Sequence, residues 1–81
     1  MARIDYLAKA DELNATLPHE GKKYAKIYCW VNRYNSKQHG VEVCICGKFQ
    51  DVATNIPRRD MMQAVDKAYN LICKRLKISA H

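Results

Sequence analysis

The spacing of apolar residues changes twice along this chain of 81 residues, from a helical repeat to a two-residue repeat and back. Between residues 3 and 17 apolar side chains recur at helical spacing. Pro18 ends this segment, because the residue before a proline is displaced from helical geometry. The apolar positions are Ile4, Leu7, Ala10, Leu13 or Asn14, and Leu17. The pattern predicts a first helix from Arg3 to Leu17, followed by a loop over residues 18–23.

Residues 24–34 alternate between small or aliphatic side chains and aromatic or polar ones, a pattern typical of a strand. A turn over residues 35–40 leads to a second alternating segment, 41–46, and a weaker third strand is expected over residues 49–55. One face of the resulting sheet would be aliphatic, formed by Ile27, Cys29, Val31, Val41, Val43 and Ile45.

The helical repeat returns after Pro57, which suits the first turn of a helix. We expect a last helix from Arg58 or Asp60 to Lys77. Its apolar stripe consists of Met61, Ala64, Val65, Ala68, Ile72 and Leu76, and its opposite side carries Arg59, Gln63, Asp66, Lys67, Asn70, Lys74 and Lys77. The element order predicts a single α+β domain over residues 1–81, α-β-β-β-α, with a three-stranded antiparallel sheet and both helices packed on its aliphatic face.

No combination of residues predicts catalysis or a cofactor. His19, His39 and His81 lie in a loop, in a turn and at the terminus, and none has the spacing of a catalytic triad. The three glycines are isolated, so no phosphate-binding loop is expected. Cys44 and Cys46 form one C-x-C pair, whereas a zinc site usually shows two such pairs. We therefore expect neither an enzyme nor a metal site.

The chain contains no apolar run as long as a membrane span, and acidic residues interrupt its first fourteen positions. These features predict a cytoplasmic protein without a membrane partner. Structural disulfides between the four cysteines are not expected in that compartment.

Basic residues dominate the charge, with 14 Lys and Arg against 8 Asp and Glu and a net charge of +6. Residues 58–77 alone carry six basic and two acidic side chains. Arg58 and Arg59 are the least expected of these, because a helix N-terminus disfavours an exposed cation by about 0.3–1 kcal/mol. Together with the free amides of the helix start, this pair predicts a phosphate site. The predicted RNA-binding residues are Lys22, Lys23, Lys26, Arg58, Arg59, Lys67, Lys74, Arg75 and Lys77.

The face opposite the aliphatic one carries an aromatic stripe with Lys26 among its members. The aromatic residues are Tyr24, Tyr28, Trp30 and Tyr34. Three interpretations are open. Unpaired RNA bases stack on the stripe, a homodimer buries it, or the two faces are inverted and the aromatic residues form the core.

Residues 60–76, DMMQAVDKAYNLICKRL, resemble the last helix of the ribosome hibernation-promoting factors, which opens Asp-Met-Tyr-x-Ala-Ile-Asp. The matching positions are Asp60, Met61, Ala64, Val65, Asp66 and Leu76, and Lys74 falls where the family is basic. Met62 stands for the family's tyrosine and Val65 for its isoleucine. Domains of this family have a strand ahead of the first helix, so this chain would be a short variant lacking that strand. The resemblance implies binding to small-subunit ribosomal RNA through basic residues, with inhibition of translation by occupancy.

Two alternatives remain beside this resemblance. The order α-β-β-β-α is also that of double-stranded RNA-binding domains, whose last helix begins Gly-x-Gly-Ser-Lys-Lys. Residues 55–61, NIPRRDM, lack those glycines, although Arg58 and Arg59 would occupy the comparable place. The other alternative is a small protein-interaction module, an inhibitor or adaptor, that uses the aromatic face or an open strand edge.

Overall fold

The computed structural model describes residues 5–18 and 23–78. The elements follow one another as α1 (Tyr6–Thr16), β1 (Ala25–Val31), β2 (His39–Ile45), β3 (Lys48–Ile56), the short 3-10 turn η2 (Arg58–Asp60) and α2 (Met61–Leu76). The predicted α+β class and the order α-β-β-β-α are therefore confirmed.

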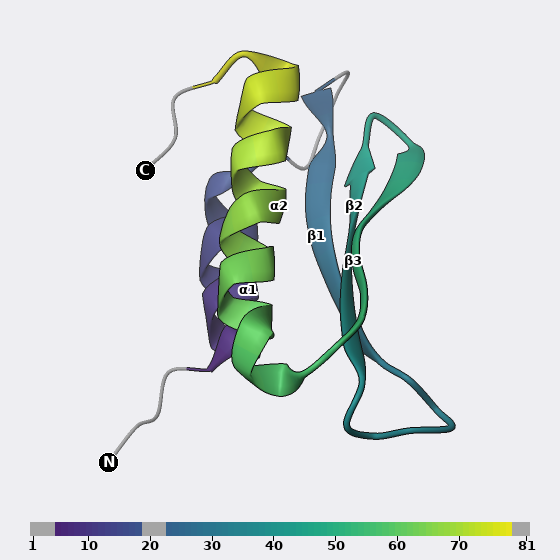
Figure 1. Cartoon of the computed structure of the whole chain (residues 1–81). Helices are drawn as coiled ribbons and strands as arrows, with labels where there is room; N and C mark the ends of the chain where they lie inside the picture. Colours follow the sequence, from purple (N-terminus) through teal and green to yellow (C-terminus); the bar gives the residue numbers. More distant parts are fainter. Residues whose placement is uncertain (1–4, 19–22, 79–81) are drawn as a thin grey trace.

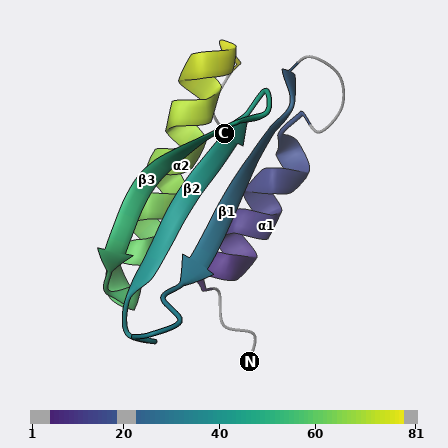
Figure 2. The same cartoon turned by 90° about the vertical axis from the view of Figure 1, so that its right-hand side faces the viewer.

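The three strands form one antiparallel sheet in the order β1-β2-β3, with β2 in the middle. Both helices lie against the same face of this sheet (Figure 1). Figure 2 shows the other face, which no helix covers. The molecule thus has two layers, and the uncovered face of the sheet is part of its surface.

The core lies between the sheet and the helices. The largest fully buried side chains are Val41 and Val43 of β2 with Met61, Val65 and Ile72 of α2. All six residues of the predicted α2 stripe are buried, and so are Ile27, Val41, Val43 and Ile45 of the predicted aliphatic face. The two faces are therefore not inverted, and the interpretation of the aromatic stripe as the core is wrong.

The predicted stripe of α1 is wrong at Leu7, whereas Ala10 and Leu17 are buried as predicted. Leu7, expected in the apolar stripe, is 51% exposed, whereas Tyr6 is buried. The Tyr6 hydroxyl lies 2.9 Å from Nδ1 of the buried His39, so the tyrosine takes the inward position and Leu7 turns outward. Tyr6, Ala10 and Leu17 form the buried side of this segment.

The first strand is shorter than predicted and does not reach Tyr34. The Asn32 side chain accepts a hydrogen bond from the Tyr34 amide through Oδ1 at 2.8 Å, an arrangement that starts a turn. Tyr34 therefore lies in the β1–β2 loop and is 89% exposed, outside the predicted aromatic stripe. Val31, at the end of β1, is 48% exposed instead of buried with the aliphatic face. Cys46 also leaves its predicted strand, since its φ of 54° places it in the β2–β3 turn.

The outer edge of β1 is held by a side chain of α1. Asn14 donates from Nδ2 to the Ile27 carbonyl at 3.0 Å and accepts from the Ile27 amide through Oδ1 at 2.8 Å. A side-chain amide thus takes the place of a neighbouring strand at this point of the edge. Of the two residues that the helical repeat allowed here, Asn14 is the one that bonds to the sheet.

Candidate nucleic-acid interface

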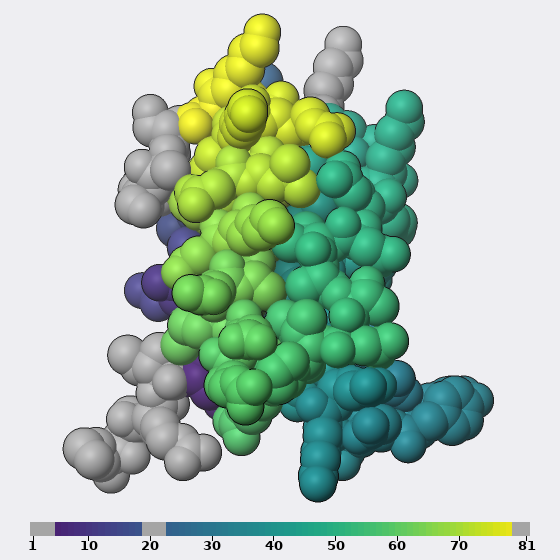
Figure 3. Space-filling model, in the orientation of Figure 1, coloured from purple at the N-terminus to yellow at the C-terminus, as the bar shows by residue number. Residues whose placement is uncertain are grey.

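The outward side of α2 forms a row of polar residues along the helix. Gln63, Lys67, Asn70 and Lys74 are spaced four, three and four residues apart, which places them on one side of a helix. All four are exposed. We call this row the α2 ridge; at 1.5 Å per residue it is about 16 Å long. In the space-filling view, α2 lies at the surface along its whole length (Figure 3).

The acidic residue that adjoins the ridge on α2 itself is engaged by the neighbouring helix. Asp66 lies beside Lys67 in the sequence, but its Oδ1 atom is 3.5 Å from Nζ of Lys9 on α1. This ion pair draws the carboxylate toward the neighbouring helix. The α2 ridge is left with two cations and two amides, and all four can donate hydrogen bonds to phosphate or ribose oxygens.

A groove runs beside the ridge, between α2 and the edge strand β3. It has a volume of about 410 Å³ and is lined by Gln50, Asp51, Val52, Lys67, Asn70, Leu71 and Lys74. Arg75 donates from Nη2 to Oε1 of Gln50 at 3.0 Å and so connects the C-terminal end of α2 with β3. The groove therefore has a basic wall on the helix, and its wall on the strand includes one acidic residue, Asp51.

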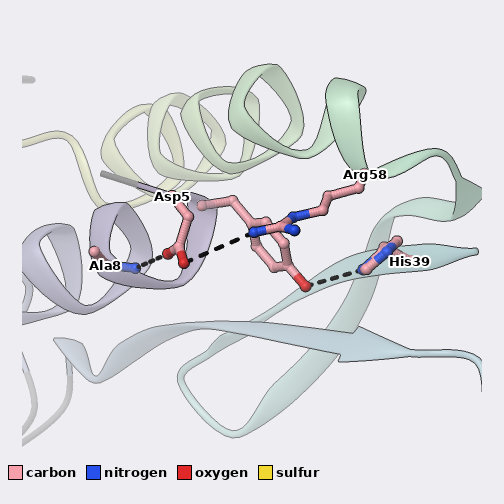
Figure 4. A network of polar contacts seen from close by, with 5 residues as sticks. Asp5, Ala8, His39 and Arg58 are labelled. Carbon is pink, nitrogen blue, oxygen red and sulfur yellow. Dashed lines mark hydrogen bonds and ion pairs between the residues drawn. The ribbon is translucent and has the colours of Figure 1, made fainter. Parts of the chain in front are cut away.

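The two arginines that the sequence predicted as one phosphate site have different surroundings in the structure. Nη2 of Arg58 lies 4.0 Å from Oδ2 of Asp5, and the same carboxylate accepts a hydrogen bond from the Ala8 amide at the start of α1 (Figure 4). Arg58 thus has an acidic partner within the fold. Arg59 is exposed and forms no ion pair with any residue that the structure describes.

Tyr6 and His39 lie next to this pair. Burial raises the pKa of Tyr6, and the nearby Arg58 acts in the opposite direction. The rings of Tyr6 and His39 also meet edge to face, with 5.5 Å between their centres. These contacts tie α1, β2 and η2 together at one end of the molecule, which favours a structural role for Arg58.

The remaining predicted cations lie at several places. Lys74, Arg75 and Lys77 gather at the C-terminal end of α2, whereas Arg59 lies at its start. Lys23 precedes β1 and is exposed, and Lys22 lies outside the described residues. Lys26 lies on the uncovered sheet face, where its Nζ atom is 5.1 Å from the centre of the Tyr28 ring. The nine predicted residues therefore do not form a single surface, and the α2 ridge with its two ends holds the largest group.

Three further exposed cations were missed by the sequence reasoning. Arg33 and Lys37 lie in the β1–β2 loop, at the end where α2 begins (Figure 1). Lys48 begins β3, two residues before the Gln50 that Arg75 contacts. Each of the three is isolated in the sequence. The antiparallel topology places the β1–β2 loop and the start of β3 at opposite ends of the sheet, as the predicted turns could have indicated, and none of the three cations lies on the α2 ridge.

The uncovered sheet face carries a smaller aromatic group than predicted. Tyr28 contacts Phe49 of β3 with 5.7 Å between ring centres, and Phe49 is 63% exposed. Trp30 lies over Gly40, its partner in β2, so closely that a side chain at Gly40 would collide with the indole. A hydrogen bond with Tyr24 raises the pKa of Tyr28. Phe49 was missed because its strand was predicted without an assigned face.

The structure offers no metal-binding constellation within residues 5–18 and 23–78, where no three His, Cys, Asp or Glu side chains converge. The four cysteines form no disulfide bonds. Burial, with a smaller effect from the charge of Asp11, raises the pKa of the Cys29 thiol to about 11. Neither helix in the described part of the chain combines the length and apolar character needed to cross a membrane.

Comparison with protein-family models, with curated proteins and with solved structures found no significant match to this chain.

Proposed function

We propose that this protein binds structured RNA through contacts of the α2 ridge with backbone phosphates. The observation that carries the proposal is the composition of the ridge. Lys67 and Lys74 alternate with Gln63 and Asn70, and the adjacent carboxylate of Asp66 is held by Lys9. An exposed helix side with cations, amide donors and no free acid is complementary to a phosphate backbone.

The cations at both ends extend this surface. Arg59 lies before the ridge, and Arg75 and Lys77 follow it. Phosphate contacts from such residues give affinity with little base specificity, so the protein acts by occupying RNA and carries out no chemistry. The preference for structured RNA follows from shape, since a straight row of donors on a rigid helix fits the regular spacing of phosphates on a folded RNA.

The small ribosomal subunit is the RNA partner that the resemblance of residues 60–76 supports. In that form of the proposal, the protein binds small-subunit ribosomal RNA and inhibits translation by occupancy. Sedimentation of cell extract through a sucrose gradient at low salt tests it. Comigration with 30S or 70S particles is expected, whereas protein confined to the top of the gradient would exclude the ribosome as partner.

Binding to RNA as such is tested separately, by fluorescence anisotropy with a labelled RNA duplex at several salt concentrations. Phosphate contacts by four of the five cations on the ridge and at its ends predict a slope of log affinity against log salt of about −3 to −4. These cations are Arg59, Lys67, Lys74, Arg75 and Lys77. Affinity should then fall roughly 100-fold between about 50 and 200 mM salt. A flat salt dependence, or no binding at low salt, would contradict the proposal even if the protein comigrated with ribosomes.

A further inference from the structure

We propose that a second copy of this chain covers the open face of the sheet and forms a two-fold symmetric dimer. The face in question is the one that neither helix contacts (Figure 2). Its aromatic residues are Tyr28 and Trp30 of β1 and Phe49 of β3, and Phe49 is 63% exposed although it is among the most apolar side chains of the sheet. Exposed aromatic groups of this kind are typical of protein interfaces.

Two acidic residues on this face have no oppositely charged partner among the described residues of one copy of the chain. Glu42 of β2 lies directly opposite Asp51 of β3. Like charges at directly opposite positions of an antiparallel pair destabilise the sheet. Neither carboxylate forms an ion pair within the described part of the chain. The only described cation on the face is Lys26 of β1, opposite Cys44, so the positive charge lies on one edge strand and the negative pair lies on the central strand and the other edge strand.

This distribution fits a second copy better than it fits RNA. A two-fold interface brings the same patch of both subunits together, so it requires a surface that carries both signs of charge. A two-fold axis that lies between the two sheets and runs diagonally to the strands would place Lys26 of one copy over the Glu42–Asp51 pair of the other, because that pair lies two residues further along the strands than Lys26. Lys26 would then approach the partner's Glu42 and the partner's Asp51, while the same pair of carboxylates would repel RNA phosphates. Glu42 and Asp51 therefore favour a second copy of the chain over RNA as the partner of this face.

The area of the face determines how strongly the two copies are expected to bind each other. Three strands about 4.8 Å apart and seven residues long cover roughly 14 by 23 Å. That is a few hundred Å² per subunit, below the roughly 800 Å² of a standard stable interface. We therefore expect a weak dimer that forms at high protein concentration and dissociates on dilution.

Sedimentation velocity over a concentration series from about 5 to 500 µM tests the dimer, with the monomer mass of 9.4 kDa as reference. The mass should rise toward twice that value, and Trp30 fluorescence should shift to shorter wavelength over the same range. Lys26→Glu should weaken the dimer at least about tenfold. Combining Lys26→Glu with Glu42→Lys restores the opposite charges and should recover most of the loss. Phe49→Ala should also weaken it, and the exposure of Phe49 makes the change compatible with folding.

Lys37→Glu is the matched control, because it makes the same change of charge in the β1–β2 loop, away from the strands of this face. A monomer at every concentration would overturn the proposal. So would a dimer that Lys26→Glu and Lys37→Glu weaken equally, since the charge pattern of the face would then have no part in it. The readout does not involve RNA, so this outcome is independent of the proposed function.

Discussion

The side-chain amide of Asn14 forms two hydrogen bonds with the main chain of Ile27, one to its carbonyl at 3.0 Å and one from its amide at 2.8 Å. A helix residue thereby satisfies main-chain groups of an edge strand that would otherwise be open to a further strand. The same contact fixes the position of α1 along β1, while its packing against α2 includes the ion pair between Lys9 and Asp66.

Asn14→Ala should lower the free energy of unfolding by about 1–3 kcal/mol, because the amide and carbonyl of the buried Ile27 lose their partners without gaining new ones. Urea denaturation measures the change. Asn70→Ala is the matched control, since Asn70 is exposed on α2 and the structure gives it no comparable bond. Equal losses for the two variants would show that the edge contact contributes nothing.

Gly40→Ala should destabilise the fold through a collision with one side chain, the indole of Trp30. The expected loss is about 1–3 kcal/mol, typical of overpacking. The indole should also move toward solvent, which shifts its fluorescence to longer wavelength. A double-mutant cycle gives the control. In a Trp30→Ala background the same Gly40→Ala change should cost much less, and an unchanged cost would mean that the collision is not the cause.

Two substitutions of Asp5 distinguish the contribution of a helix cap to stability from that of an exposed ion pair. Its carboxylate caps α1 by accepting from the Ala8 amide at 3.0 Å and lies 4.0 Å from Arg58 (Figure 4). Asp5→Ala should cost about 1 kcal/mol of stability, as loss of an N-cap does. Asp5→Asn keeps a capping oxygen and removes only the charge, so it should cost a few tenths of a kcal/mol. Equal losses of the two variants in thermal denaturation would assign the main role to the ion pair.

The Cys29 thiol should react slowly with iodoacetamide at moderately alkaline pH, because burial raises its pKa from 9.0 to about 11 and the thiolate is the reacting species. At pH 9 only about 1% of Cys29 would be ionised in the folded protein, against about half in the unfolded chain. Mass spectrometry of the labelled peptide should show a folded-state rate that keeps rising up to about pH 11. A plateau near pH 9 would contradict the shift.

The sign of this shift also has a consequence for stability. Well below pH 9 the thiol is protonated in both states and contributes no pH dependence. Between pH 9 and about pH 11 the unfolded chain releases the proton more readily than the folded protein does, so stability should fall as pH rises through this window. Cys29 is only half-buried, and solvent screening reduces the size of the effect.

Much of the fold could be predicted because its elements obey simple periods. The α2 stripe repeats helically from Met61 to Leu76, and Val41, Val43 and Ile45 alternate in β2, so these buried residues were predicted from spacing alone. Tyr69 and Cys73 of α2 and His39 and Cys44 of β2 are buried as well and were not predicted. Helix α1 was harder. Ala10 and Leu17 are buried as their spacing predicted, but the burial of Tyr6 instead of Leu7 goes with a long-range bond between Tyr6 and His39, and sequence spacing contains no information on a partner 33 residues away.

The candidate site was predictable only in part, for the same physical reason. Lys67 and Lys74 share a helix side by spacing, so their exposure together could be foreseen. The ion pair of Arg58 with Asp5 could not, since it depends on how α1 packs beside η2. Phe49 and the opposition of Glu42 to Asp51 depend on strand register, which the sequence left undetermined.

The central claim is that the α2 ridge contacts RNA phosphates, and the salt dependence of binding by a matched pair of variants tests it most directly. Lys67→Ala with Lys74→Ala removes two charges from the ridge, and Lys26→Ala with Lys37→Ala removes two charges from the sheet face and the β1–β2 loop. With a labelled RNA duplex, the ridge variant should lower the magnitude of the log–log salt slope by about 2, one for each lost contact. The control variant should leave the slope close to that of the unmodified protein. Equal slopes for both variants, whatever their affinities, would contradict the claim that the ridge contacts the phosphates.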